Sequence, residues 1–148
     1  MLEFLAAGLL LGAVTFSVVQ CALLWAGQGA VETASHFAAR RFAVAARADS
    51  RRAREAALAE AASMCRNRPG GRLANAAMTS LDFSRNGTEG VPLKANPGDA
   101  YRVRLTHWVE LAVPWLDRVL YSLASCPKTR IGGRYYLGLQ ATRWVTVE

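Results

Sequence analysis

The chain has 148 residues, 52% of them hydrophobic, and a formal net charge of +7 from 18 Lys and Arg against 11 Asp and Glu. For that length, one small domain and a membrane segment is the natural count. The three cysteines form no C-x-x-C motif and the two histidines stand alone, so the composition argues against a metal site.

An uncharged apolar run occupies residues Phe4 to Ala26, and the rest of the chain is organised around it. Its 23 residues would rise about 34 Å as an α-helix, enough to cross a hydrocarbon layer of about 30 Å. Because every backbone N–H and C=O must be satisfied inside lipid, we predict a transmembrane helix. No Lys or Arg precedes the run, and it is longer than the ~7–15 apolar residues of a signal peptide, which argues against a secretory signal.

The polar segment that follows favours continuation of the same helix. It is rich in Ala and Arg, and the first proline in the chain is Pro69. We therefore expect the helix to leave the membrane as a stalk that ends at Asn67–Gly71. Small or apolar residues recur on one face of the stalk at helical spacing, with a slip of one residue, and this face is expected to pack on a sheet or on other helices. The face comprises Val31, Ala34, Ala38, Phe42, Ala45, Ala48, Ala53, Ala57, Ala61 and Met64.

Arginine is concentrated in the stalk and just after it. Nine arginines (40, 41, 47, 51, 52, 54, 66, 68 and 72) stand against three acids (Asp49, Glu55 and Glu60). Such a basic stripe can attract nucleic acid or anionic lipid. We favour the simpler interpretation of a solvated helix face with i,i+4 pairs such as Arg51–Glu55.

Short segments with strand character follow the stalk. Residues 76–84, 101–113 and 134–148 alternate in the manner of β-strands. The intervening tracts 85–90, 96–99 and 131–133 are turn-like, and residues 115–124 fit either a helix or a loop.

We therefore predict an α+β fold, in which a long N-terminal helix packs on a small, mostly antiparallel sheet that needs a helix to cover its apolar face. The expected division is residues 1–27 for the hydrophobic helix, 28–68 for its polar continuation and 69–148 for the β domain.

Three features of the apolar run suggest contacts with other helices. Gly8 and Gly12 form a G-x-x-x-G motif, which allows helices to approach closely. Glu3 places a carboxylate at the start of the run. At the membrane interface it needs no partner, whereas deeper in the membrane it requires a cationic one. Gln20 either hydrogen-bonds across a helix interface or marks the outer boundary near Trp25, an expected interfacial anchor.

Cys65 and Cys126 are a candidate disulfide if the domain lies outside the cytoplasm, where a bridge would tie the end of the stalk to the globular part. Cys21 is expected to be a small packing residue. No G-x-S-x-G, H-E-x-x-H or glycine-rich phosphate loop occurs, and His107 is expected to be a packed or surface residue. We therefore expect no enzymatic activity, no cofactor and no metal.

The order of these features resembles that of type IV pilin-like proteins, and more closely that of the TadE-like minor pilins (pseudopilins) of the tight-adherence, or Tad/Flp, pilus. Leu2-Glu3-Phe4 is similar to the family's V-E-F start of the apolar run. Residues 34–43 (ASHFAARRFA) resemble its A-x-x-x-A-A-R-x-x-A segment after the membrane, and residues 139–148 resemble its closing strand.

The resemblance implies a structural subunit that is cleaved by a prepilin peptidase and held by a single pass in the bacterial inner membrane, with its C-terminal domain extracytoplasmic. Helix bundling with other pilin subunits would then build a pilus, or fimbrium, at the cell surface, with a role in adhesion or pilus biogenesis. The family's glutamate near the mature N-terminus is thought to pair with a neighbouring subunit's terminal amine, and here that role falls on Glu3. The basic leader ending in glycine that precedes the family's glutamate does not stand before Glu3.

An alternative is a membrane-tethered accessory module whose basic stalk binds nucleic acid or another anionic polymer. The stalk arginines are not interleaved with aromatic residues, as binders of single strands require. We therefore favour the pilus subunit and expect no nucleic-acid partner.

Overall fold

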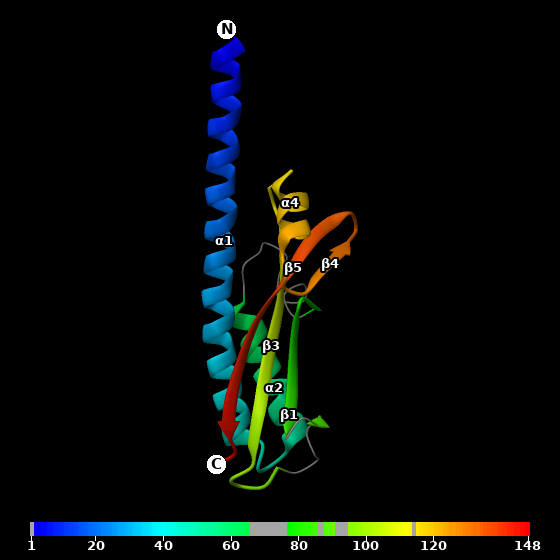
Figure 1. Ribbon diagram of the computed structural model, residues 1–148. Helices are drawn as coiled ribbons and strands as arrows, with labels where there is room; N and C mark the ends of the chain where they lie inside the picture. The colour runs from blue at the N-terminus through cyan, green and yellow to red at the C-terminus, as the bar shows by residue number, and fades with distance from the viewer. Residues whose placement is uncertain (1, 66–76, 86–87, 91–94, 114) are drawn as a thin grey trace.

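The computed structural model describes residues 2–65, 77–85, 88–90, 95–113 and 115–148. A long N-terminal helix, α1 (Leu2–Ala45), runs the length of the molecule, and a small antiparallel sheet packs against its C-terminal half (Figure 1). The predicted α+β fold is confirmed. The expected end of the stalk at residues 67–71 and the domain boundary at 68–69 lie outside the described residues.

α1 is one continuous helix, although its composition changes from apolar to polar along its length. Within the apolar run the hydroxyl groups bond back to the helix itself. Thr15 Oγ1 donates to the Leu11 carbonyl (2.8 Å) and Ser17 Oγ to the Ala13 carbonyl (2.7 Å). These hydroxyls are therefore satisfied without water, and the run remains compatible with lipid.

The polar segment forms two helices, so the single stalk predicted for residues 28–68 is wrong. α1 ends at Ala45, and after a short turn α2 (Ser50–Met64) returns alongside it (Figure 1). The residue that separates the two helices is Asp49. Its side chain caps α2 by accepting hydrogen bonds from the backbone N–H groups of Arg51 (3.0 Å) and Arg52 (3.2 Å). An aspartate cap starts a new helix where propensity alone would continue the old one, and it accounts for the slip in the small-residue spacing.

The described residues form one sheet of five antiparallel strands in the order β2-β1-β3-β5-β4. They are β1 (Thr79–Arg85), β2 (Thr88–Glu89), β3 (Ala100–Glu110), β4 (Lys128–Ile131) and β5 (Arg134–Thr146). The three predicted strands are thus present as β1, β3 and β5. Gly132 and Gly133 join β4 to β5 with φ angles of +58° and +81°, which L-residues with a side chain rarely adopt.

An alanine-rich face of the α1–α2 hairpin covers one face of the sheet. Phe42 is at its centre, with its ring centroid 4.4 Å from that of Phe83 on β1 and 5.5 Å from that of Tyr101 on β3. The packing face predicted from the sequence is buried at seven positions: Val31, Ala34, Ala38, Phe42, Ala53, Ala57 and Ala61. Small side chains let the two helices and the sheet approach closely, so an apolar core forms in a domain with few large residues.

Candidate functional site

The first half of α1 projects beyond the sheet and α2 (Figure 1). Its apolar side chains are uncovered. The exposed fraction is 86% for Phe4, 70% for Leu10 and 58% for Phe16. This helix is long and apolar enough to cross a membrane. A contiguous apolar surface of this kind requires lipid or another protein around it, so the projecting half of α1 is the first part of the functional site.

Glu3, Gly8 and Gly12 all lie on this projecting segment. Glu3 is exposed in the first turn of α1, where the helix dipole favours a carboxylate. A Cβ atom added at Gly8 or Gly12 would have nothing within 4 Å. The three predicted assembly residues are therefore accessible along one bare helix.

The glycine face borders an apolar groove between α1 and a short helix, α4 (Leu116–Leu123). The groove has a volume of about 320 Å³. Gly8, Gly12 and Phe16 line it from α1, and Trp115, Leu116 and Val119 line it from the other side. The sequence left residues 115–124 as a helix or a loop, and the structure places a helix there.

Gln20 joins the apolar helix to the β domain. It is 0% exposed, and its Oε1 accepts hydrogen bonds from the backbone N–H groups of Ala112 (3.1 Å) and Val113 (3.2 Å), which lie between β3 and α4. The sequence left two roles open for Gln20, and the structure gives it a partner within its own chain. Further along α1, Gln28 Nε2 donates to the Gln140 carbonyl on β5 (3.3 Å).

The stalk arginines form an exposed face on the helical hairpin, as predicted. Arg40, Arg41, Arg47, Arg51, Arg52 and Arg54 are all exposed, and Arg66, Arg68 and Arg72 lie outside the described residues. The predicted pair between Arg51 and Glu55 is present, with the Arg51 Nε 3.6 Å from the Glu55 carboxylate. Exposed pairs of this kind contribute roughly 0–1 kcal/mol, so the stripe is a solvated surface and not a source of stability.

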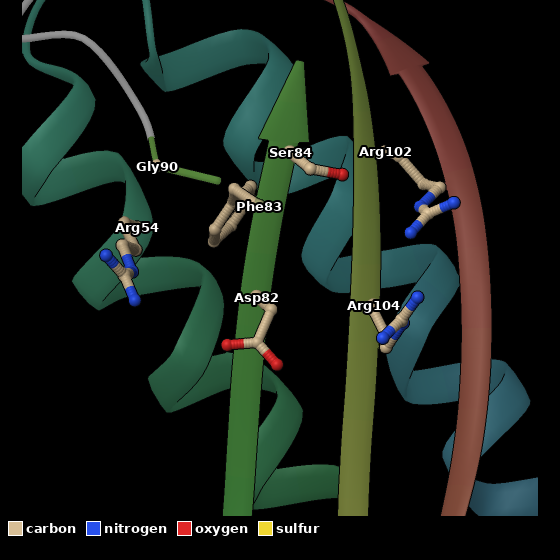
Figure 2. A pocket seen from close by; sticks show the side chains of 7 residues that line it. All are labelled: Arg54, Asp82, Phe83, Ser84, Gly90, Arg102 and Arg104. Atoms are coloured by element: carbon tan, nitrogen blue, oxygen red, sulfur yellow. The ribbon is translucent and has the colours of Figure 1, made fainter. Parts of the chain in front are cut away.

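A cationic cavity of about 230 Å³ lies beside β1 (Figure 2). Its described lining is Arg54 from α2, Asp82, Phe83 and Ser84 from β1, Arg102 and Arg104 from β3, and Gly90. The guanidinium of Arg54 lies 5.8 Å from the centre of the Phe83 ring. The Arg102 Nε is buried and has no hydrogen-bond partner in the described part of the chain. Three guanidinium groups against one carboxylate favour an anionic ligand.

Cys65 and Cys126 are free thiols in the structure, so the disulfide predicted from the sequence is not formed. Cys65 follows α2 and is 0% exposed in the core, whereas Cys126 is partly exposed in the turn before β4. Burial raises the pKa of the Cys65 thiol to about 11. A protonated thiol enclosed in the core behaves as a small hydrophobic side chain. Cys21, expected as a packing residue, is exposed on α1.

The last two candidates from the sequence are His107 and a metal site. His107 is 4% exposed on β3, and its Nδ1 lies 2.9 Å from Thr79 Oγ1 on the neighbouring strand. Among the described residues, no group of three or more His, Cys, Asp and Glu side chains is placed to hold a metal ion.

No family model, curated protein sequence or solved structure matches the chain.

Proposed function

We propose that this chain is a structural subunit of a Tad-type or related type IV-like pilus, a TadE-like minor pilin that assembles through its N-terminal helix. The observation that carries the proposal is the division of α1 into an uncovered half and a packed half. One helix presents an uncovered apolar segment at its start and packs onto an antiparallel sheet at its end. A helix divided in this way can sit in a membrane first and in a bundle of identical helices afterwards, because both surroundings are apolar.

Glu3 gives the bundle its register in this proposal. A carboxylate that enters an apolar bundle is stabilised only if a cation meets it, because its desolvation costs several kcal/mol. The terminal amine of a neighbouring subunit is the cation that the family resemblance supplies. Gly8 and Gly12 lie one turn apart on α1 and leave one strip of the helix without side chains, so a neighbouring helix can approach it closely.

The setting proposed is the bacterial inner membrane, with a single pass and the β domain outside the cytoplasm, before assembly into a pilus that serves adhesion or pilus biogenesis. The partners are other pilin subunits, a prepilin peptidase and the assembly machinery. Support comes from the membrane-capable length of α1 and from the residue pattern around Glu3 and residues 34–43.

The test is incorporation of a Glu3→Ala variant into filaments sheared from cells. We expect the variant to insert into the membrane at the normal level and to be depleted from the sheared fraction by at least tenfold. Glu55→Ala, which removes an exposed carboxylate from α2, is the control and should be incorporated normally. Normal incorporation of the Glu3 variant would remove the role assigned to this residue. Absence of the wild-type chain from every sheared fraction would remove the pilus function itself.

A second variant tests helix packing independently of charge. Replacing Gly8 and Gly12 by Leu fills the open helix face and should weaken association of the chain in membranes. Gly29→Leu is the matched control, because Gly29 is also helical and also has nothing within 4 Å of an added Cβ. Equal crosslinked oligomers from both variants would remove the glycine motif from the assembly surface.

The cationic cavity favours a second candidate function, a membrane-tethered module that binds an anionic polymer. It differs from the stalk stripe in having a buried arginine nitrogen without a hydrogen-bond partner among the described residues. Retention of the detergent-solubilised protein on heparin or single-stranded DNA would test this candidate. Exchange of Arg102 and Arg104 for Gln should then lower the eluting salt concentration more than the same exchange at Arg51 and Arg52. Equal effects would assign the binding to net charge alone.

A further inference from the structure

α4 is amphipathic, but its apolar side is turned away from the domain to which it belongs. Trp115 and the helix residues Leu116, Val119, Leu120 and Leu123 fall on one side at helical spacing, and Asp117, Arg118, Tyr121 and Ser122 fall on the other. None of the helix residues is buried. The exposed fraction is 79% for Trp115, 51% for Val119 and 74% for Leu123.

The contacts that hold α4 come from its polar side and its C-terminal end. The ring of Tyr121 packs on that of Tyr135 on β5, with 4.9 Å between the centroids. Lys128 Nζ donates to the carbonyls of Tyr121 (3.0 Å) and Ala124 (3.3 Å), which places a cation at the negative end of the helix dipole. A helix on a water-soluble domain would show the reverse arrangement, with its apolar side against the sheet.

We propose that α4 is a membrane-interface helix, which lies in the boundary between headgroups and acyl chains beside α1. This inference goes beyond the pilus function and requires only that α1 inserts into a bilayer. The position of α4 indicates that lipid covers its apolar side. The groove next to α4 is lined by Gly8, Gly12 and Phe16, which belong to the membrane-capable segment. Lipid that surrounds this part of α1 necessarily reaches Trp115 and Val119.

The backbone before α4 is adapted to the same surroundings. Irregular backbone is tolerated at membrane depth only where its polar groups are satisfied within the protein. Gln20 satisfies two of these groups by accepting from the N–H groups of both Ala112 and Val113, whereas its own buried Nε2 has no hydrogen-bond partner among the described residues. Trp115 has a φ of +75°, a conformation that costs of order 1–3 kcal/mol for a residue with a side chain. The strained backbone carries a tryptophan that is almost fully exposed, and the bilayer interface is the position that this side chain prefers.

Charge on the polar side matches anionic headgroups. Arg118 and Arg130 are exposed and Lys128 lies at the end of α4, against one acid, Asp117. With α4 at the interface, the apolar length of α1 from Phe4 to Gln20 is about 25 Å, which is close to the thickness of a hydrocarbon layer. Residues 21–26 then cross the headgroup layer, where Trp25 is an expected anchor.

The experiment measures the depth of single spin labels on the full chain in vesicles of phosphatidylethanolamine and phosphatidylglycerol. Labels are placed at Val119→Cys and Leu123→Cys on the apolar side, and at Arg118→Cys and Ser122→Cys on the polar side as matched controls. Cys21 and Cys126 are replaced by Ala and Ser, and the enclosed Cys65 is retained. Collision rates with oxygen, which concentrates in lipid, and with a water-soluble nickel chelate are compared at each position.

We expect the ratio of oxygen to nickel collisions to be several-fold higher at positions 119 and 123 than at 118 and 122. Equal, water-like ratios at all four positions would overturn the proposal. Low collision rates with both reagents at 119 and 123 would also overturn it, because they would mean that a second copy or another protein covers α4. The measurement does not involve filaments, so its failure is separate from failure of the pilus function.

Discussion

Gln20 and Ala112 are 92 residues apart in the chain and are joined by a 3.1 Å hydrogen bond from the Ala112 N–H to Gln20 Oε1. The same oxygen accepts from the N–H of Val113 at 3.2 Å. One side chain on the apolar helix therefore satisfies two consecutive backbone donors of an irregular segment. This contact fixes where the β domain meets the membrane-capable half of α1.

The first prediction is that Gln20→Leu destabilises the attachment of the domain to α1. The substitution leaves two part-buried N–H groups without their acceptor, and a fully buried donor left unsatisfied costs roughly 1–3 kcal/mol. We expect the free energy of unfolding in detergent micelles to fall by about 2–4 kcal/mol and proteolysis near residues 111–113 to accelerate. Thr15→Val is the control, because the Thr15 hydroxyl bonds only to its own helix. Equal stability of the two variants would mean that Gln20 does not hold this segment.

The second prediction concerns Phe42, where α1 enters the core. Phe42 is 0% exposed and its ring contacts those of Phe83 and Tyr101, so Phe42→Ala should lower the free energy of unfolding by roughly 3–5 kcal/mol. Phe37 lies on the same helix but is 43% exposed, and Phe37→Ala should cost less than about 1 kcal/mol. Denaturant unfolding followed by circular dichroism measures both. Similar losses would show that the core is not centred on Phe42.

The burial of Phe42 was predictable because it follows from local periodicity, and so was the pairing of Arg51 with Glu55. The turn between α1 and α2 was missed although Asp49 signals it. Alanine-rich sequence on both sides favours one long helix, and a single capping aspartate decides between the two outcomes. The slip in the apolar spacing was the second signal for the same turn.

Other features were beyond reach of the sequence because they depend on contacts that are distant in the chain. The partners of Gln20 are Ala112 and Val113, which lie 92 and 93 residues further along the chain. Nothing in the sequence next to Gln20 indicates them. β4 is a four-residue edge strand without regular alternation of buried and exposed side chains, so it carries no periodic signal. The disulfide between Cys65 and Cys126 was inferred from compartment and from their places at the stalk end and in the globular part, whereas the structure leaves both thiols free, with Cys65 buried in the core.

A third prediction uses two glycines with opposite surroundings. A Cβ atom added at Gly138 on β5 would lie 3.2 Å from Pro127 Cβ and 3.2 Å from Trp108 Cζ3. Gly138→Ala should therefore lower the free energy of unfolding by about 1–3 kcal/mol through overpacking. Gly29→Ala has open space on α1 and should raise it by roughly 0.5–1 kcal/mol, because Ala favours the helix. Unfolding midpoints that shift in the same direction for both variants would contradict the packing described around Gly138.

The last prediction is a pH dependence that originates at Cys65. Burial raises the pKa of this thiol from 9.0 to about 11, so the folded chain holds the proton more tightly than the unfolded chain. The resulting stability is fully present below about pH 9 and is lost as the pH rises toward about 11. Two pKa units correspond to roughly 2–3 kcal/mol. Wild type should therefore lose more stability than Cys65→Ala between these pH values, measured by denaturant unfolding at each pH.

Cys126→Ala is the matched control for that series, because it removes a partly exposed thiol and leaves Cys65 in place. Tyr101 titrates in the same direction in all three proteins, since burial and the neighbouring Asp99 carboxylate raise the pKa of its hydroxyl. The difference between wild type and Cys65→Ala thus isolates the thiol. If the two proteins lose stability in parallel up to pH 11, the Cys65 thiol is not enclosed in the core.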